Sequence, residues 1–94
     1  RQDNFFIVNA NNGAVIKNIY LGYGLDISPI EIFEYNGNIL FGGKNGIVYQ
    51  IDRNYKLKKL LFLGNARVYP IYQIKNNIFL ASNMDGKLVV FSLQ

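Results

Sequence analysis

The sequence of 94 residues contains no cysteine, histidine, tryptophan or threonine. Without cysteine and histidine the chain can form no disulfide, no thiol nucleophile and no imidazole base, and it lacks the usual protein ligands of zinc. Long hydrophobic runs are also missing, because the longest, such as residues 60–63, fall far short of the roughly 20 residues of a membrane-spanning helix. These absences exclude most common catalytic chemistry and leave no transmembrane segment.

Charge of either sign is sparse. Ten lysines and arginines stand against six aspartates and glutamates, which gives a formal net charge of +4. The basic residues are scattered, apart from Lys56, Lys58 and Lys59, and this distribution is typical of a solvated surface. A nucleic-acid partner is therefore not expected, since such proteins carry a basic patch or stripe.

Glycine-containing turn dipeptides interrupt the chain at regular intervals. Asn12-Gly13, Asn36-Gly37, Asn45-Gly46 and Asp85-Gly86 are pairs that favour the two positive-φ positions of type I′ hairpin turns. Gly13, Gly37, Gly46 and Gly86 are accordingly predicted to be structural turn residues. Short runs rich in Ile, Val, Tyr and Phe separate the turns, and no segment keeps an apolar stripe at helical spacing.

The predicted class is all-β. The expected strands are residues 5–9, 14–20, 30–35, 38–42, 47–52, 57–63, 71–74, 78–82 and 87–93.

The second half of the chain contains an internal repeat. An apolar strand, small residues, an Asn/Asp-Gly turn and a second apolar strand occur twice, at an offset of 39 (Asn38 to Asn77) to 40 (Gly46 to Gly86) residues. A period of about 40 residues with four short strands is the spacing of a β-propeller blade. A free-standing sandwich or barrel with similar hairpins is the structural alternative.

The predicted strands group into partial and complete blades. With strands labelled A to D from the propeller axis outward, the chain has the pattern C-D, then A-B-C-D, then A-B-C. Residues 1–94 are thus predicted to be one propeller fragment: the outer half of a blade (1–22), a complete blade (28–64) and a final blade without its outer strand (69–94). About two blades cannot close a ring of roughly four to eight. We therefore expect the C-terminal part of a larger propeller, completed by missing blades or by a homo-oligomer.

Two stretches carry a family likeness. Residues 8–16 and 39–52 resemble the quinoprotein-type (PQQ-like) β-propeller repeat, and residues 36–52 and 77–93 are similar to the closing blades of BamB-like lipoproteins of the outer-membrane β-barrel assembly machinery. The resemblance implies a non-enzymatic scaffold for protein partners in outer-membrane protein assembly. It also implies a periplasmic or cell-envelope location.

The chain departs from the quinoprotein enzymes of this family at several positions. Their repeats carry a tryptophan that packs between blades, whereas the corresponding places here hold Ile19-Tyr20 and Phe62-Leu63. Lys56 stands where the repeat usually has glycine, which leaves the following strand open to a shift of one residue. The small pair Gly42-Gly43 is explained by close approach of the backbone where a strand ends.

The acidic residues form no recognisable catalytic set. Glu31 and Glu34 are three apart in a predicted strand and so point to opposite faces, while Asp52 and Asp85 occupy positions that favour turns. We expect no catalytic residue, metal or cofactor. Two other functions remain open: the tail of a quinoprotein-like oxidoreductase with its catalytic blades outside this chain, and a propeller sensor that binds unfolded polypeptide along open strand edges.

Exposed aromatic residues next to arginine are typical of protein-binding hot spots. Tyr20, Tyr23, Tyr69 and Tyr72 lie in or beside the predicted connections between blades, with Arg67 nearby, and they are the candidate partner-binding residues. The alternative is that these tyrosines pack between blades in place of tryptophan. Residues 22–28 are predicted to be an exposed variable loop.

Overall fold

The computed structural model describes residues 2–28 and 31–93, and the chain is all-β, as predicted. Every expected strand is present, although Ile30, which begins one of them, and the terminal residues 1 and 94 lie outside the described residues. The strands are β1 (Gln2–Val8), β2 (Val15–Tyr23), β3 (Ile32–Tyr35), β4 (Asn38–Gly42), β5 (Ile47–Ile51), β6 (Leu57–Phe62), β7 (Tyr72–Lys75), β8 (Ile78–Ser82) and β9 (Leu88–Ser92).

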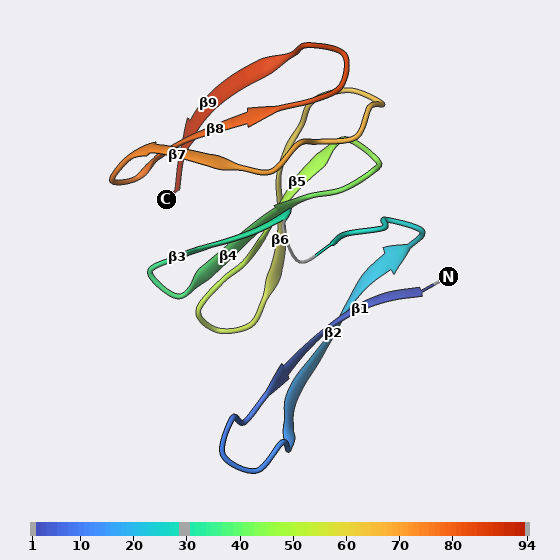
Figure 1. Ribbon diagram of the computed structural model, residues 1–94, viewed down its shortest axis with the longest axis vertical. Coiled ribbons are helices and arrows are strands. Elements are labelled where there is room, and N and C mark those ends of the chain that lie inside the picture. The colour runs from blue at the N-terminus through green and yellow to red at the C-terminus, as the bar shows by residue number, and fades with distance from the viewer. Residues whose placement is uncertain (1, 29–30, 94) are drawn as a thin grey trace.

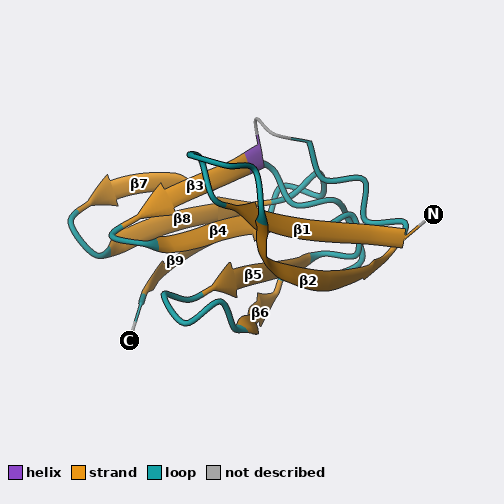
Figure 2. Ribbon diagram, turned by 90° about the horizontal axis from the view of Figure 1, so that it is seen from below, coloured by secondary structure: helices purple, strands orange, loops and turns teal. Residues whose placement is uncertain are grey.

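The strands form three antiparallel sheets in which sequence neighbours are also spatial neighbours. The first sheet is β1-β2, the central sheet is β3-β4-β5-β6 and the last sheet is β7-β8-β9. They follow one another along the 42 Å long axis of the molecule (Figure 1), and seen from below they lie one behind another (Figure 2). The grouping into two, four and three strands is the one expected. The described residues form no closed sheet, so the propeller itself stays a prediction.

The central sheet is covered on both faces because alternate side chains point to opposite sides of a strand. Phe41, Tyr49 and Ile51 face the first sheet and form a core with Ile19. The ring of Phe41 stacks on Tyr49 within the sheet and on Phe5 of the first sheet, with centroids 5.3 and 6.3 Å apart. The two sheets are therefore joined by apolar packing.

The opposite face of the central sheet packs on the last sheet in the same way. Leu40 and Val48 are fully buried there against Phe79 and Ala81. The ring of Tyr35 meets Phe79 edge-on at 5.1 Å, a favourable geometry for two aromatic rings. The chain thus holds two apolar layers separated by one four-stranded sheet.

Residues 63–69, which form most of the connection from β6 to β7, bind the central sheet through its β4–β5 turn. The backbone N–H of Leu63 donates to the carbonyl of Gly46 (2.9 Å), and the N–H of Val68 donates to that of Gly43 (3.2 Å). The Val68 side chain is buried against Gly42, where any Cβ would overlap it. The close approach predicted for the small pair is confirmed at Gly42.

The same connecting segment also binds the last sheet. The N–H of Tyr69 donates to the carbonyl of Ser82 (2.9 Å), and Val68 forms an isolated bridge with Asn83. The buried amide of Asn83 donates to the carbonyl of Leu63 (2.9 Å). Residues 63–69 therefore fix the spacing of the central and last sheets.

The predicted type I′ geometry is correct for one turn and wrong for three. Only Asn36-Gly37 has positive φ at both residues, at 49° and 81°. In the β4–β5 turn, Gly46 N–H donates to Gly43 and Gly43 N–H to Ile47, which is the three-residue loop with a single positive-φ glycine. The β8–β9 turn has the same bonds, and the β1–β2 loop is longer. Asn45, Asp85 and Asn12 do not adopt positive φ because these loops are longer than two residues.

The β5–β6 turn has the three-residue geometry but no glycine. Asp52 N–H donates to Lys56 and Tyr55 N–H to Asp52, and Tyr55 occupies the positive-φ position at 63°. The missing glycine is therefore at position 55, not at Lys56. The strand register does shift, through an irregularity in β5–β6 pairing between Val48 and Tyr49.

We expect Gly46→Ala to be far more destabilising than Gly86→Ala. Both glycines have positive φ, which costs an alanine about 1 to 2 kcal/mol. A Cβ at Gly46 would also overlap the carbonyl oxygen of Gly64, whereas a Cβ at Gly86 meets nothing within 4 Å. Urea unfolding should show a loss of about 3 kcal/mol or more for Gly46→Ala and about 1 for Gly86→Ala. Equal losses would contradict the packing of residues 63–69 on the turn.

Tyr55→Gly should stabilise the chain. Glycine adopts positive φ without strain, so we expect the free energy of unfolding to rise by about 1 kcal/mol. Asn54→Gly is the matched control, because Asn54 does not have positive φ, and it should be neutral or destabilising. A loss of stability in Tyr55→Gly, measured by urea unfolding, would contradict the turn geometry.

Candidate functional site

The candidate tyrosines do not form one patch. Tyr20 lies on the face of the first sheet that points away from the central sheet, and Tyr72 lies on the corresponding outer face of the last sheet. Tyr23 ends β2, and Tyr69 lies beside β8. All four are exposed, and none packs between the three described sheets.

The packing between sheets is provided by other side chains. Ile19 and Leu63, at the two places where the quinoprotein-type repeat that the sequence resembles has tryptophan, are buried, one in each apolar layer. Phenylalanine rings such as Phe41 and Phe79 supply the aromatic contacts. Local sequence gave no signal that phenylalanine from neighbouring strands would fill these positions.

Arg67, the fifth candidate, forms an internal ion pair. Its Nη1 lies 3.1 Å from Oε1 of Glu31, and both side chains are largely shielded from solvent. The same Nη1 donates to the carbonyl of Asp26 at 3.5 Å, and Lys44 pairs with the Asp26 carboxylate at 3.6 Å. Arg67 therefore ties the β6–β7 connection to the segment before β3. Glu31 was expected to be an exposed charge on a strand or a turn residue. It lies just before β3 and is the ion-pair partner of Arg67.

The segment 22–28 is not the exposed loop predicted. Gly22 and Tyr23 belong to β2, and Leu25 is buried in the apolar layer with Phe41. The backbone N–H of Leu25 donates to the Asp3 carboxylate at 2.6 Å. These contacts are made between residues far apart in the chain, which the sequence pattern could not indicate.

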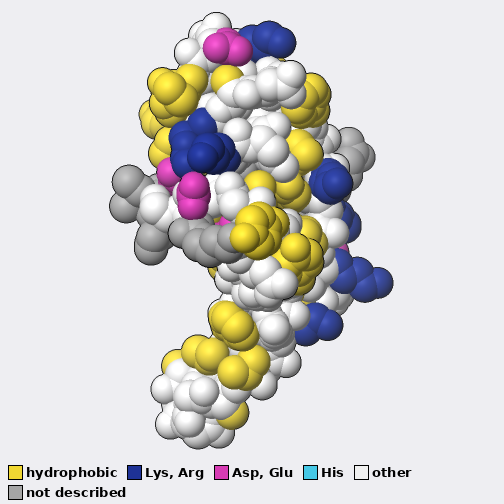
Figure 3. Space-filling model, turned by 90° about the vertical axis from the view of Figure 1, so that its right-hand side faces the viewer, with side chains coloured by type: hydrophobic (Ala, Val, Ile, Leu, Met, Phe, Trp, Pro, Cys, Tyr) yellow, Lys and Arg dark blue, Asp and Glu magenta, His cyan; other side chains and the backbone are white. Residues whose placement is uncertain are grey.

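Each end of the stack has an open apolar face. Phe6, Val8, Val15 and Tyr20 form the N-terminal end face, on β1 and β2. Hydrophobic side chains are visible on this hairpin at the lower end of Figure 3. Tyr72, Leu80, Leu88 and Val90 form the C-terminal end face, where Tyr72, Leu80 and Val90 are paired in one row across three strands.

The central sheet shows how such positions behave when they are covered. The turn at residues 43–47 has the same hydrogen bonds as that at residues 83–87, so Val48 and Gln50 correspond to Leu88 and Val90. Val48 is 0% and Gln50 7% exposed, whereas Leu88 is 69% and Val90 61% exposed. The C-terminal end face thus corresponds to the face of the central sheet that the last sheet covers.

The N-terminal end face has the same relation to the central sheet. Phe6 and Val8 precede the β1–β2 loop as Tyr49 and Ile51 precede the β5–β6 turn. Tyr49 is 3% and Ile51 0% exposed beneath the first sheet, against 56% for Phe6 and 51% for Val8. Both ends therefore present positions that are buried in the middle of the stack.

A polar hollow of about 340 Å³ lies at the opposite rim from residues 63–69. It is lined by Asn38, Gln50, Asp52, Arg53, Asn54 and Lys58. Its polar groups bind one another, with Gln50 Nε2 2.9 Å from Asn38 Oδ1 and Lys58 Nζ 3.4 Å from Asp52 Oδ2. Over residues 2–28 and 31–93 there is no cluster of three acidic side chains that could hold a metal ion.

The surroundings of Asp52 lower its pKa. Its Oδ1 accepts the backbone N–H of Lys56 (3.0 Å) and of Asn54 (2.8 Å). The pKa of Asp52 is lowered from its ordinary value of 3.8, chiefly by the Lys56 N–H and further by Asn54 and Lys58, against an opposing effect of burial. Asn83 makes the same pair of bonds in the β8–β9 turn. The role of Asp52 is to close a turn.

The described residues thus define an all-β chain of three stacked antiparallel sheets with an open apolar face at each end. No family model matches the chain, and no curated protein or solved structure does. Among the described residues no helix is long and apolar enough to cross a membrane.

Arg67 and Glu31 should be energetically coupled. We expect Arg67→Met, Glu31→Gln and the double variant to give a coupling of about 1 to 2 kcal/mol, because the pair is shielded and hydrogen-bonded. The ion pair of Lys44 and Asp26 serves as the comparison; it is more exposed, so its coupling free energy should be less than about 0.5 kcal/mol. Urea unfolding at low and high salt measures both. No coupling between Arg67 and Glu31 would leave Arg67 free for a partner.

The Asp52 turn should make stability sensitive to acid. Because the folded pKa is lowered, the stabilisation is fully present above about pH 3.8 and is lost as pH falls through the lower folded value. Asp52→Asn keeps a side-chain oxygen that can accept both backbone N–H groups, as Asn83 does in the β8–β9 turn. It removes the carboxyl group, so position 52 no longer titrates. The gap in unfolding free energy between parent and Asp52→Asn should therefore narrow as pH falls from 5 to 2. A constant gap would contradict the assignment.

Proposed function

We propose that this chain is a non-enzymatic scaffold, a segment of a β-propeller whose stacked sheets present rigid surfaces to protein partners. The observation that carries the proposal is the burial pattern of the central sheet. Positions with 0% and 7% exposure there, Val48 and Gln50, are open at the equivalent Leu88 and Val90 of the last sheet. A sheet that repeats the central one at either end would bury these positions.

Energetics support a continuing stack. Full burial of a Leu, Val or Phe side chain contributes about 1.5 to 3 kcal/mol, and each end face has several such side chains. Repeat units of this kind bury their faces against neighbours and are stable only in arrays. The antiparallel meander of each sheet, with strands in chain order, also suits a propeller blade.

The internal arrangement of polar groups supports a role without bond chemistry. The charged residues Arg67 and Asp52 hold a connection and a turn in place. Over the part of the chain that is described, no buried side-chain nitrogen or oxygen lacks a hydrogen-bond partner. We therefore propose binding, and not catalysis, as the function of this segment.

The proposed setting is the cell envelope, in the assembly of outer-membrane proteins. It rests on the resemblance of residues 36–52 and 77–93 to the closing blades of BamB-like lipoproteins. The exposed Tyr20 and Tyr72 lie on the end faces, so in a longer stack they would contact neighbouring sheets. Tyr23 and Tyr69, outside those faces, are the proposed partner contacts.

The test is the solution mass of the 94-residue chain, measured by light scattering. We expect self-association through the end faces, and Val90→Lys should weaken it at least about tenfold because a charge then enters an apolar contact. Met84→Lys is the matched control, since Met84 is as exposed as Val90 but lies in the β8–β9 turn. A stable monomer of 10.7 kDa with one cooperative thermal transition would overturn the proposal.

A further inference from the structure

The outer edge of the last sheet has no partner strand among the described residues. In the central sheet β5 pairs with β4 on one side and with β6 on the other. In the last sheet β9 pairs with β8 alone. The N–H of Asn83 donates to the carbonyl of Lys87, and antiparallel pairing then alternates, so the backbone groups of Val90 and Ser92 point away from β8. Such an edge can bond a further strand.

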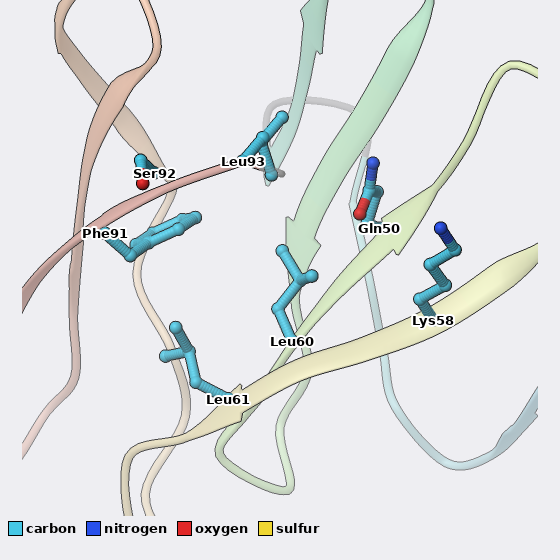
Figure 4. A pocket seen from close by; sticks show the side chains of 7 residues that line it. All are labelled: Gln50, Lys58, Leu60, Leu61, Phe91, Ser92 and Leu93. Atoms are coloured by element: carbon cyan, nitrogen blue, oxygen red, sulfur yellow. The ribbon is translucent and has the colours of Figure 1, made fainter.

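A cavity of about 360 Å³ lies beside this edge, between β6 and β9. Leu60 and Leu61 border it from the central sheet, and Phe91 and Leu93 border it from the last sheet (Figure 4). Gln50, Lys58 and Ser92 complete the lining. Apolar side chains from two sheets thus meet around a space large enough for one or two side chains.

The preceding sheet shows what fills the equivalent space. There Leu57 of β6 is paired with Ile51 of β5 and packs in the apolar layer toward the first sheet. The shared turn geometry makes Phe91 the equivalent of Ile51. A strand added to β9 in the same register would place one side chain opposite Phe91, at the cavity.

We propose that the β9 edge and this cavity form a docking site for an extended strand of another polypeptide. The strand runs antiparallel to β9, bonds to the outward backbone groups of Val90 and Ser92, and inserts an apolar side chain opposite Phe91. Backbone bonds provide affinity and the cavity selects the side chain, as in other strand-addition complexes. This site lies on the edge of the last sheet, whereas the self-association proposed above uses the end faces.

The chemistry of the cavity favours a peptide strand over a small polar ligand. Lys58, its one charged group, is already paired with Asp52 at 3.4 Å. Gln50 donates to Asn38 at 2.9 Å. The groups left to recognise a ligand are apolar side chains, the Ser92 hydroxyl and the row of strand amides and carbonyls along β9.

The probe is a synthetic peptide with the sequence of residues 56–63, Lys-Leu-Lys-Lys-Leu-Leu-Phe-Leu. These residues include β6, the strand that pairs with the equivalent edge of β5 in the central sheet. Amide hydrogen exchange of the 94-residue chain is followed with and without peptide. We expect added protection at Val90 and Ser92, and none along the free edge of β3. Protection confined to β5, or none at all, would overturn the proposal.

A peptide variant tests the cavity without altering the protein. Replacing the peptide leucine that corresponds to Leu57 by aspartate should weaken binding at least about tenfold, because that side chain faces Phe91. Replacing the lysine that corresponds to Lys58, on the opposite face of the strand, by serine is the matched control and should change binding less than about threefold. Equal effects would mean binding without use of the cavity.

A protein variant tests the edge. Val90→Pro removes an N–H that points away from β8, so pairing with β8 should persist while peptide binding is lost. Retained exchange protection of β8 shows that the sheet is intact. Peptide binding by a folded Val90→Pro chain would overturn the proposal. The results with the parent chain do not depend on self-association, because the peptide can bind β9 whether or not the end faces are covered, whereas Val90→Pro also alters the C-terminal end face.

Discussion

The contact of residues 63–69 with two neighbouring turns is the constraint on which the arrangement of the last two sheets depends. Among the described residues no strand ladder joins the central sheet to the last one, and residues 63–69 instead bond to both, through Gly43 and Gly46 on one side and Ser82 and Asn83 on the other. The segment therefore sets the spacing at which Leu40 meets Phe79. That spacing requires glycine at position 42, because the Val68 side chain lies against its backbone. It also requires glycine at position 46, because the carbonyl of Gly64 lies where a Cβ would be. The small residues of the repeat thus serve the contact between sheets more than the turn itself.

A stack of such sheets leaves an apolar face exposed at each end. Each sheet has apolar side chains on both faces, and in the central sheet both faces are buried. At the ends the same alternation leaves Phe6 and Val8 on one side and Leu88 and Val90 on the other in contact with solvent. Short stacks bury a small fraction of their surface and are correspondingly marginal. The exposed apolar end faces therefore account both for the need for neighbouring sheets and for the proposed scaffold function. The free edge of β9 offers a second kind of contact, through backbone hydrogen bonds.

Much of the fold could be predicted because it depends on neighbours in sequence. Short apolar runs between turn dipeptides marked the strands, several of them with alternating apolar residues, and the two-, four- and three-stranded grouping followed from the repeat. The turns were located correctly, but three were given the wrong geometry because the dipeptide signal does not report loop length. Tyr55 carried no signal at all, since a tyrosine at positive φ is tolerated only when the surrounding pairing imposes it. The candidate tyrosines left two interpretations open, a binding surface and packing between blades, and the structure places Tyr20 and Tyr72 on opposite end faces of the stack.

By itself the sequence determined the all-β class, the strands and their division among sheets, because hydrophobic alternation and turn residues act within a few positions of one another. The tertiary structure alone decided which contacts join the sheets. Arg67 reaches Glu31 across 36 residues, and Leu25 bonds to Asp3 across 22. It also decided that Phe91, Leu60 and Leu61 enclose a cavity beside an open edge. Such features arise where separate strands meet in space, and no local pattern records the distance between two sheets.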